Sequence, residues 1–437
     1  MLPFLKNKAH YFGYSLLFST FSIAFTSPIP LEISSMLEAE DALLFGAEAD
    51  IGFGIADIKY SENAIKILEF GEGPRSKFEG YDQLHGAGSI WKQIWEWLFE
   101  LHPKIFYIDT YMTNRAEEER INLDYFKQRG GRVFKNIRQL INSSDFKRAR
   151  NNDFKRTQLI SDYSGVVMFR HQNPSNETIA AFKKQYPEFI VFDAGIASFV
   201  NNKQKTDSLF TEEPFKQFRP HAQCYEKAYS PELVENILTD FPEEILVIKP
   251  LNSCKGNGVI ITHRNDLDET LQMILQKTQG IELSDDTSYS YWTHDRNKTF
   301  LIESYEPSRP LEFEGKTYDA TLRIVYALML HAGAITVRIL DGYWKLPFKA
   351  QEEEGTLTEK AKSKINTSRH SSCILSEEDR IVVGSKFMEF MPQLYKKMLT
   401  NGVTNPMERS VRPHSPFLRF IAEEILASRT KWLKKKR

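Results

Sequence analysis

The stretch Ile245–Thr262 reads ILVIKPLNSCKGNGVIIT, and it decides the fold that we expect. An apolar run ends at Lys249, a polar loop with Gly256 and Gly258 follows, and a second apolar run completes the segment. The spacing is not that of a P-loop, and no helical pattern follows the glycines. The pattern therefore predicts two antiparallel strands that are joined by a glycine-rich flap.

Such a flap suits nucleotide phosphates, because glycines allow backbone N–H groups to approach an anion closely. Lys249, at the end of the first strand, would add a fixed positive charge. The alternative interpretation is an ordinary hairpin with glycines in its turn.

Three further apolar segments follow the flap and are typical of strands: Phe300–Ser304 (FLIES), Tyr318–Ala327 (YDATLRIVYA) and Ile335–Leu340 (ITVRIL). In this order, the lysine strand, the flap and these segments resemble the ATP-grasp superfamily over roughly residues 201–398. The resemblance is to the glutathione synthetase-like ATP-binding fold and to the ribosomal-modification and tubulin-ligase enzymes. It implies an α/β fold in which two α+β subdomains clasp ATP.

The resemblance also implies roles for individual residues. Lys203, with Lys205 as a second choice, and Lys249 would neutralise the α- and β-phosphates. The remaining nucleotide-binding candidates are Lys255, Gly256, Asn257 and Gly258 in the flap, Glu303 and Tyr305 at the adenine, Glu306 at the ribose, and Asn366 in a later loop. The candidates for catalysis, which would face the transferred phosphoryl group, are Arg323, Arg338 and Lys345.

The metal-binding strands that normally close an ATP-grasp fold are not recognisable after Leu399. An early hairpin could supply them, because Asp57 and Glu69 lie twelve residues apart on two strands that a short turn joins. Carboxylates at one rung of a hairpin could share Mg²⁺, which prefers oxygen ligands. Gly71 stands where the family has asparagine, with Glu72 as a stand-in. We infer a circularly permuted domain; the alternative is a plain hairpin that caps the first sheet.

The first half of the chain predicts a parallel sheet. Ile90–Leu101 has the spacing of an amphipathic helix, and strands and helices alternate after it. We divide the chain into an N-terminal segment (residues 1–45, a signal or a helix), the early hairpin (46–80), a parallel-sheet domain that precedes the ATP-grasp domain (81–200), the ATP-grasp domain (201–400), and a C-terminal helix with a basic tail (401–437).

Composition limits the classes of function. The chain has 437 residues, 26% of them charged, and a net charge of −1, so no basic field for nucleic acid is expected. Three cysteines without a C-x-x-C pair indicate neither a disulfide framework nor a zinc site. The composition is that of an ordinary soluble protein.

The N-terminus is open to several interpretations. Lys6 and Lys8 precede an apolar stretch, residues 11–25, which is about as long as a signal-peptide core and short for a membrane span. Pro28 fits a cleavage site poorly, and ATP-dependent chemistry favours the cytoplasm. Export, or a later start at Met36, are the alternatives, and whether residues 1–27 are cleaved stays open.

The expected function is that of an ATP-dependent carboxylate–amine ligase with ATP and Mg²⁺ as cofactors. The resemblance implies that a small-molecule or peptide carboxylate forms an acyl phosphate, which an amine then attacks. The alternatives are an ATP-grasp protein that binds nucleotide without catalysis, as Gly71 suggests, and an exported protein that uses its basic tail on an acidic partner. The sequence names neither the acceptor nor the amine nor the oligomeric state.

Overall fold

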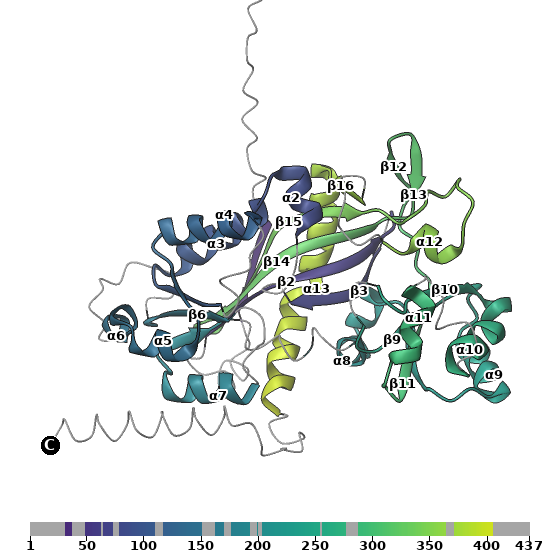
Figure 1. Ribbon diagram of the computed structural model, residues 1–437, viewed down its shortest axis with the longest axis horizontal. Helices are drawn as coiled ribbons and strands as arrows, with labels where there is room; N and C mark the ends of the chain where they lie inside the picture. The colour runs from purple at the N-terminus through teal and green to yellow at the C-terminus, as the bar shows by residue number, and fades with distance from the viewer. Residues whose placement is uncertain are drawn as a thin grey trace, which may run out of the picture.

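The computed structural model describes residues 31–36, 49–62, 64–72, 78–109, 117–150, 162–169, 176–192, 199, 203–253, 256–276, 287–363 and 371–404. These residues form a mixed α/β structure with one parallel sheet and two larger antiparallel arrangements (Figure 1). The predicted α/β class, with a parallel sheet in the first half of the chain, is confirmed.

The parallel sheet has the order β5-β4-β6-β7, and every neighbouring pair runs in parallel. The apolar strands β4, β6 and β7 are buried on both faces, because helices cover both faces of the sheet, whereas β5 lies at the edge and is partly exposed. Ile105, Tyr107 and Met168 face one core, and Phe106 and Val167 face the other. The strands are β4 (Ile105–Ile108), β5 (Arg132–Phe134), β6 (Gly165–Phe169) and β7 (Phe189–Val191), and the helices are α3 (Ser89–Leu101), α4 (Glu117–Gln128), α5 (Ile137–Asn142), α6 (Ser144–Arg150) and α7 (Asn176–Gln185).

A second sheet, the lid sheet, is antiparallel with the order β10-β9-β11-β8. Its strands are β8 (Ala222–Glu226), β9 (Ile245–Pro250), β10 (Ile260–His263) and β11 (Thr299–Ser304). Ile248 lies opposite Ile260, which confirms the strand–flap–strand prediction. Helices α9 (Pro231–Asp240) and α10 (Leu267–Leu275) share a hydrophobic core with this sheet, and α11 (Thr287–His294) adds Trp292 to that core.

The central sheet combines strands from both ends of the chain. Its order is β1-β15-β14-β2-β3, with β16 also pairing with β15, and all of its pairs are antiparallel. The strands are β1 (Leu31–Met36), β2 (Asp50–Tyr60), β3 (Ile65–Glu72), β14 (Thr321–His331), β15 (Ala334–Lys345) and β16 (Ser372–Ile374). The early hairpin β2–β3 therefore completes a sheet whose other long strands come from residues 321–345, as Figure 1 shows by the purple strands beside the green ones.

Both faces of the central sheet are covered. Tyr326 and Leu328 pack with the long helix α13 (Glu377–Thr404), whereas Phe53 and Val325 pack with α3 and with α2 (Glu79–His85). All eleven residues of β2 are buried, which is expected of a strand that is covered on both sides. The hairpin thus packs on the first domain and also belongs to the central sheet, so the two interpretations of it are compatible.

The remaining described elements are short. They are α8 (Lys203–Ser208), the 3-10 helices Phe215–Phe218 and Arg264–Asp266, the hairpin β12 (Leu311–Phe313) and β13 (Lys316–Tyr318), and α12 (Leu357–Ala361). Residues 31–36 form β1, so this part of the segment predicted as a signal or a helix is a strand, which is held by its pairing with β15. The apolar stretch 11–25 and the basic tail lie outside the described residues. Among the described helices, none has the length and apolarity to cross a membrane.

Candidate functional site

Four of the predicted site residues meet on one face of the central sheet. Asp57 in β2 lies opposite Arg323 in β14 on one side and Glu69 in β3 on the other. The Arg323 guanidinium donates from Nε to Asp57 Oδ1 at 2.7 Å and from Nη2 to Oδ2 at 2.9 Å. Lys345 Nζ donates to the same Oδ2 at 2.9 Å. We call Asp57, Arg323 and Lys345 the central cluster.

A β-bulge puts Glu69 beside this cluster. Ile58 lies opposite Ile67, but Asp57 lies opposite Glu69, so Leu68 is the extra residue of β3. A regular register would have put Leu68 opposite Asp57 and turned the Glu69 side chain to the other face of the sheet. The bulge therefore brings the two predicted metal carboxylates to one face, a detail that the sequence pattern does not encode.

The charges of the central cluster and of Glu69 suit a ligand that carries both an anion and a cation. Burial opposes ionisation of Asp57, but Arg323 and Lys345 outweigh it and hold the pKa of this carboxyl well below its usual range. Burial, together with the neighbouring Arg323, lowers the pKa of Lys345. The two cations outnumber the one carboxylate of the cluster, but Glu69 beside it brings the sum of the four charges to zero. A phosphate oxygen suits the two cations, and a metal ion suits the two carboxylates.

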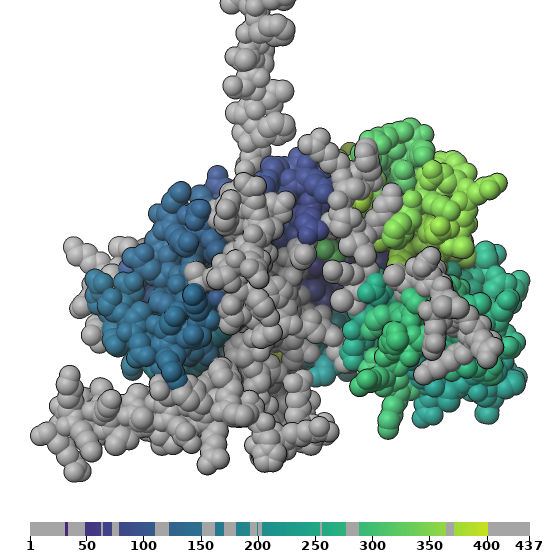
Figure 2. Space-filling view, in the orientation of Figure 1, coloured from purple at the N-terminus to yellow at the C-terminus, as the bar shows by residue number. Residues whose placement is uncertain are grey.

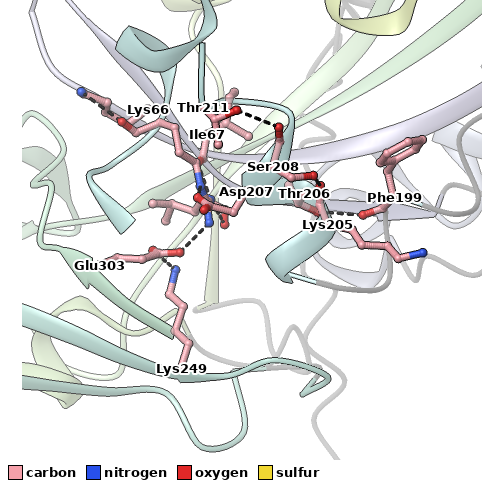
Figure 3. A network of polar contacts seen from close by, with 12 residues as sticks. Lys66, Ile67, Phe199, Lys205, Thr206, Asp207, Ser208, Thr211, Lys249 and Glu303 are labelled. Atoms are coloured by element: carbon pink, nitrogen blue, oxygen red, sulfur yellow. Dashed lines mark hydrogen bonds and ion pairs between the residues drawn. The ribbon is translucent and has the colours of Figure 1, made fainter. Parts of the chain in front are cut away.

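A second cluster, the lid cluster, consists of Glu303, Lys249 and Arg219. Glu303 Oε2 accepts from Lys249 Nζ of the neighbouring strand, and Oε1 accepts from Arg219 Nη2 at 2.6 Å. Figure 3 shows the labelled Lys249 and Glu303 side chains pointing toward each other from the two strands. Burial opposes ionisation of Glu303, but Arg219 and Lys249 outweigh it, so its pKa lies below the usual value.

Arg219 connects the lid cluster to the central sheet. Its Nη1 donates to the carbonyl oxygens of Ile67 at 2.8 Å and Leu68 at 2.6 Å, and its Nε contacts Asp207 Oδ1 at 3.3 Å. The guanidinium therefore touches both the pair Glu303–Lys249 and the bulge of β3. Sequence reasoning missed this residue, because a lone arginine before a proline carries no motif.

The hinge after β11 makes further polar contacts. Glu306 lies 3.7 Å from Lys66 Nζ, and the Tyr305 hydroxyl donates to Asp319. Asp319 also accepts from Lys59 Nζ at 2.7 Å. Lys59 and Lys66 lie opposite each other on β2 and β3, two rungs from Asp57 and Glu69. The structure thus places two further lysines near the carboxylates, and no motif in the sequence singles them out.

The glycine flap adopts the backbone that its sequence predicts. Gly256 and Gly258 have φ of +70° and +74°, in the left-handed region that favours glycine. The Gly258 carbonyl accepts from Trp292 Nε1 at 2.9 Å, and Asn257 is half-buried between the glycines. At the start of the flap, Lys203 Nζ donates to the Ser253 carbonyl at 2.7 Å. Lys255 and Asn366 lie outside the described residues.

Arg338 does not join the central cluster. Its Nη1 lies 2.8 Å from Glu100 Oε2 of α3, and its backbone pairs with Ala327. It precedes Lys345 by seven residues on the same strand, a separation of roughly 20 Å in an extended chain. The placement of Arg338 therefore gives no support to the catalytic role expected from the sequence.

Asp57 and Glu69 are the two carboxylates that the sequence predicts to hold a magnesium ion. Among the described residues, no group of three or more histidine, cysteine, aspartate or glutamate side chains is arranged to hold a metal ion. Mg²⁺ is commonly bound by one or two carboxylates together with substrate phosphates and water, rather than by a cage of protein ligands. Asp57 and Glu69 lie at one rung and supply two carboxylates of that kind. Both oxygens of Asp57 accept from Arg323 and Lys345 in this structure, so a metal ion would replace part of these contacts.

Comparison with known proteins gives structural similarities only. No protein-family model and no curated protein matches the chain. A putative gamma-glutamylcysteine synthetase from Methylobacillus flagellatus KT is 7% identical with a TM-score of 0.34, over 85% of this chain and 98% of that one. D-cycloserine synthetase is 10% identical with a TM-score of 0.31, over 67% of this chain and 81% of that one. D-alanyl-alanine synthetase A from Vibrio cholerae O1 biovar eltor str. N16961 is 12% identical with a TM-score of 0.29, over 67% of this chain and 80% of that one.

Proposed function

We propose that this protein is an ATP-dependent carboxylate–amine ligase of the ATP-grasp type, with the metal strands supplied by the N-terminal hairpin. The observation that carries the proposal is the position of Asp57, opposite Glu69 and in contact with Arg323 and Lys345. Anion-binding and cation-binding groups are thus adjacent on one sheet face, as the transfer of a phosphoryl group from a metal-bound nucleotide requires.

In this proposal the nucleotide lies between the lid sheet and the central sheet. Lys203 and Lys249 neutralise the α- and β-phosphates, and the backbone of the glycine flap covers them. Glu303, which holds Lys249, and the chain at Tyr305 border the adenine, while Glu306 borders the ribose. The arrangement is supported by the contact of Arg219, which brings the lid cluster against β3.

Arg323 and Lys345 would face the γ-phosphoryl group and stabilise the charge that builds on it during transfer. A magnesium ion held by Asp57 and Glu69 would neutralise the β- and γ-phosphate oxygens. An oxygen of the acceptor carboxylate attacks the γ-phosphorus while the bond to the β-phosphate oxygen breaks and ADP leaves. The amine nitrogen then attacks the carbonyl carbon of the acyl phosphate, phosphate leaves, and the nitrogen loses a proton to give an amide.

The acyl phosphate must be protected from water until the amine arrives. The flap, which is anchored through Trp292 and Gly258, is suited to this task because it can close over the phosphates. The parallel-sheet domain packs on the same face of the central sheet, beyond Val325, and would border the small-molecule or peptide acceptor. Dependence on ATP is consistent with a cytoplasmic location for the proposed activity.

A second candidate is a protein that binds nucleotide without catalysis. Gly71 lies opposite Ile55, so this position of β3 offers no side-chain ligand where the family pattern has asparagine. A metal site with one ligand fewer would favour binding over turnover.

Measurement of ADP release with and without Mg²⁺, over a panel of carboxylates and amines, separates the two candidates. We expect carboxylate-dependent ADP release that requires Mg²⁺ and that falls at least 100-fold in E69Q, because charge stabilisation dominates phosphoryl transfer. The exposed E244Q substitution is the matched control, since Glu244 lies on the lid and its side chain is 87% exposed. Tight ATP binding without ADP release by any carboxylate would favour the non-catalytic alternative.

A further inference from the structure

We propose that Arg219 is a positioning residue that couples nucleotide binding to magnesium binding, an inference that rests on the proposed function. Nothing in the sequence singles out this residue. Its side chain is 3% exposed and lies where the lid sheet meets the central sheet.

On the lid side, Arg219 fixes the carboxylate that orients Lys249. Glu303 has one oxygen on Lys249 and the other on Arg219 Nη2, so its position is set by both partners. Lys249 is the residue that we assign to the phosphates. Any shift of Arg219 would therefore be transmitted through a buried carboxylate to the phosphate-binding lysine.

On the other side, Arg219 fixes the bulge that aims Glu69. The two carbonyls that it binds, those of Ile67 and Leu68, immediately precede Glu69. Because this bulge determines that Glu69 lies opposite Asp57, the guanidinium supports the geometry of both proposed metal carboxylates. Groups that orient metal ligands in this way have large effects on metal affinity without touching the metal.

Only a guanidinium can make all of these contacts at once. Arg219 uses Nε on Asp207, Nη1 on two carbonyls and Nη2 on Glu303. A lysine has a single nitrogen on a flexible stem and cannot satisfy the carboxylate of one sheet and the carbonyls of the other. The R219K substitution therefore keeps the charge and removes the connection.

The consequence is a coupling between the two ligands. If nucleotide orders the lid cluster and Mg²⁺ orders β3 through Glu69, each ligand improves the site of the other by the same factor, as linkage requires. The measurable quantity is the ratio of the ATP dissociation constants without and with Mg²⁺.

The test is titration of the full chain with ATP in the presence of EDTA or of excess Mg²⁺. We expect R219K to lower the Mg²⁺ enhancement of ATP affinity by roughly tenfold or more, in line with other residues that orient metal ligands. The matched control is R264K, because Arg264 also donates to two backbone carbonyls, those of Leu238 and Phe241, within the lid. The control should leave the ratio within twofold of the wild-type ratio.

A merely structural role would lower the midpoint of thermal unfolding and leave this ratio unchanged, which would overturn the inference. An equal loss of ATP affinity with and without Mg²⁺ would also overturn it. If R219K does not fold, D207A removes the acceptor of Arg219 Nε and should lower the ratio by a smaller factor, whereas an unchanged ratio in D207A would contradict the coupling.

The double variant R219K/E69Q tests the route of the coupling. If Arg219 acts through Glu69, the second substitution should lower the ratio no further than E69Q alone; additive losses would contradict that route. If the wild-type chain binds ATP more tightly with Mg²⁺, and R219K has the same ratio of dissociation constants, this inference alone is refuted. A wild-type chain that binds no nucleotide would refute the proposed function as well.

Discussion

The central cluster and the lid cluster have the same composition, one carboxylate between two cations, but they differ in access to solvent. The Asp57 side chain keeps 10% exposure and its partners 13% and 14%, whereas Glu303 keeps 1% and its partners Arg219 and Lys249 keep 3% and 9%. The central cluster also has Glu69 beside it, while Glu303 is enclosed between the lid sheet and Arg219. A similar set of charges is therefore buried in both places, but solvent reaches the central cluster more than it reaches Glu303 and Arg219.

The difference suggests a division of labour. Charges that solvent can reach can exchange partners, so the phosphate and the metal ion could replace contacts within the central cluster at moderate cost. Charges that are enclosed lose heavily when any partner is removed, so Glu303 is suited to holding Lys249 and Arg219 in fixed positions. The following predictions test this comparison.

The largest expected effect is that of E303Q on stability. The neutral side chain leaves Lys249 and Arg219 buried with less compensating charge, which should lower the free energy of unfolding by about 3–5 kcal/mol. D57N should cost less, about 1–3 kcal/mol, because solvent reaches Arg323 and Lys345. Urea unfolding of both variants measures the difference.

The control for this pair is D145N, because Asp145 contacts Arg132 and Arg148 on the surface, and its loss should change stability by no more than about 1 kcal/mol. Equal destabilisation by E303Q and D57N would contradict the distinction between an enclosed and an accessible cluster.

A second prediction concerns acid. The folded pKa values of Asp57 and Glu303 lie below their usual values, so below about pH 4 the unfolded chain binds protons that the folded chain does not. Their stabilising contribution is present above that pH and is lost as the pH falls. The urea midpoint should therefore decline between about pH 5 and pH 3, and less steeply in D57N. A D57N profile that runs parallel to the wild-type profile would show that this carboxyl has no depressed pKa.

The smallest expected effect distinguishes the two flap glycines. A Cβ at Gly258 would lie 2.4 Å from Cγ of Pro250 and 2.7 Å from Cδ1 of Tyr291. Both are ring atoms, which cannot easily move. A Cβ at Gly256 would meet only the flexible end of Lys362, at 3.0 Å. Both positions have positive φ, so each alanine costs about 1 kcal/mol, and G258A should cost about 1 kcal/mol more. Thermal unfolding and ATP titration of G256A and G258A measure the difference. Equal unfolding midpoints and equal ATP affinities of the two variants would show that the flap adjusts freely at Gly258.

Much of the fold was predictable from local patterns. The four parallel strands, the helix Ser89–Leu101 and the hairpin β9–β10 follow from apolar runs, from 3.6-residue periodicity and from glycines in a turn. The strands β8 and β1 and the helix α11 were not predicted. Strand β8 (AQCYE) is short and mostly polar, and β1 is defined by its pairing with β15, so neither shows a period of its own.

The site was predictable only in part. The resemblance to ATP-grasp proteins pointed to Asp57, Glu69, Arg323 and Lys345, and the structure brings these residues together, although their roles remain predictions. The same resemblance also pointed to Arg338, which is on strand β15 with Lys345, but the Arg338 side chain contacts Glu100 and does not join the central cluster. A strand pattern gives the face of a side chain but not its distance from a partner strand, which depends on register and bulges.

The sequence by itself determined the alternation of strands and helices, the flap and the residue types that suit phosphate and magnesium, because these depend on neighbours within a few positions. Only the tertiary structure decided that β2 lies beside β14, that the bulge at Leu68 turns Glu69 toward Asp57, and that Arg219 joins the two sheets. These contacts connect residues that are distant along the chain. They are set by the packing of whole sheets, which no short stretch of sequence records.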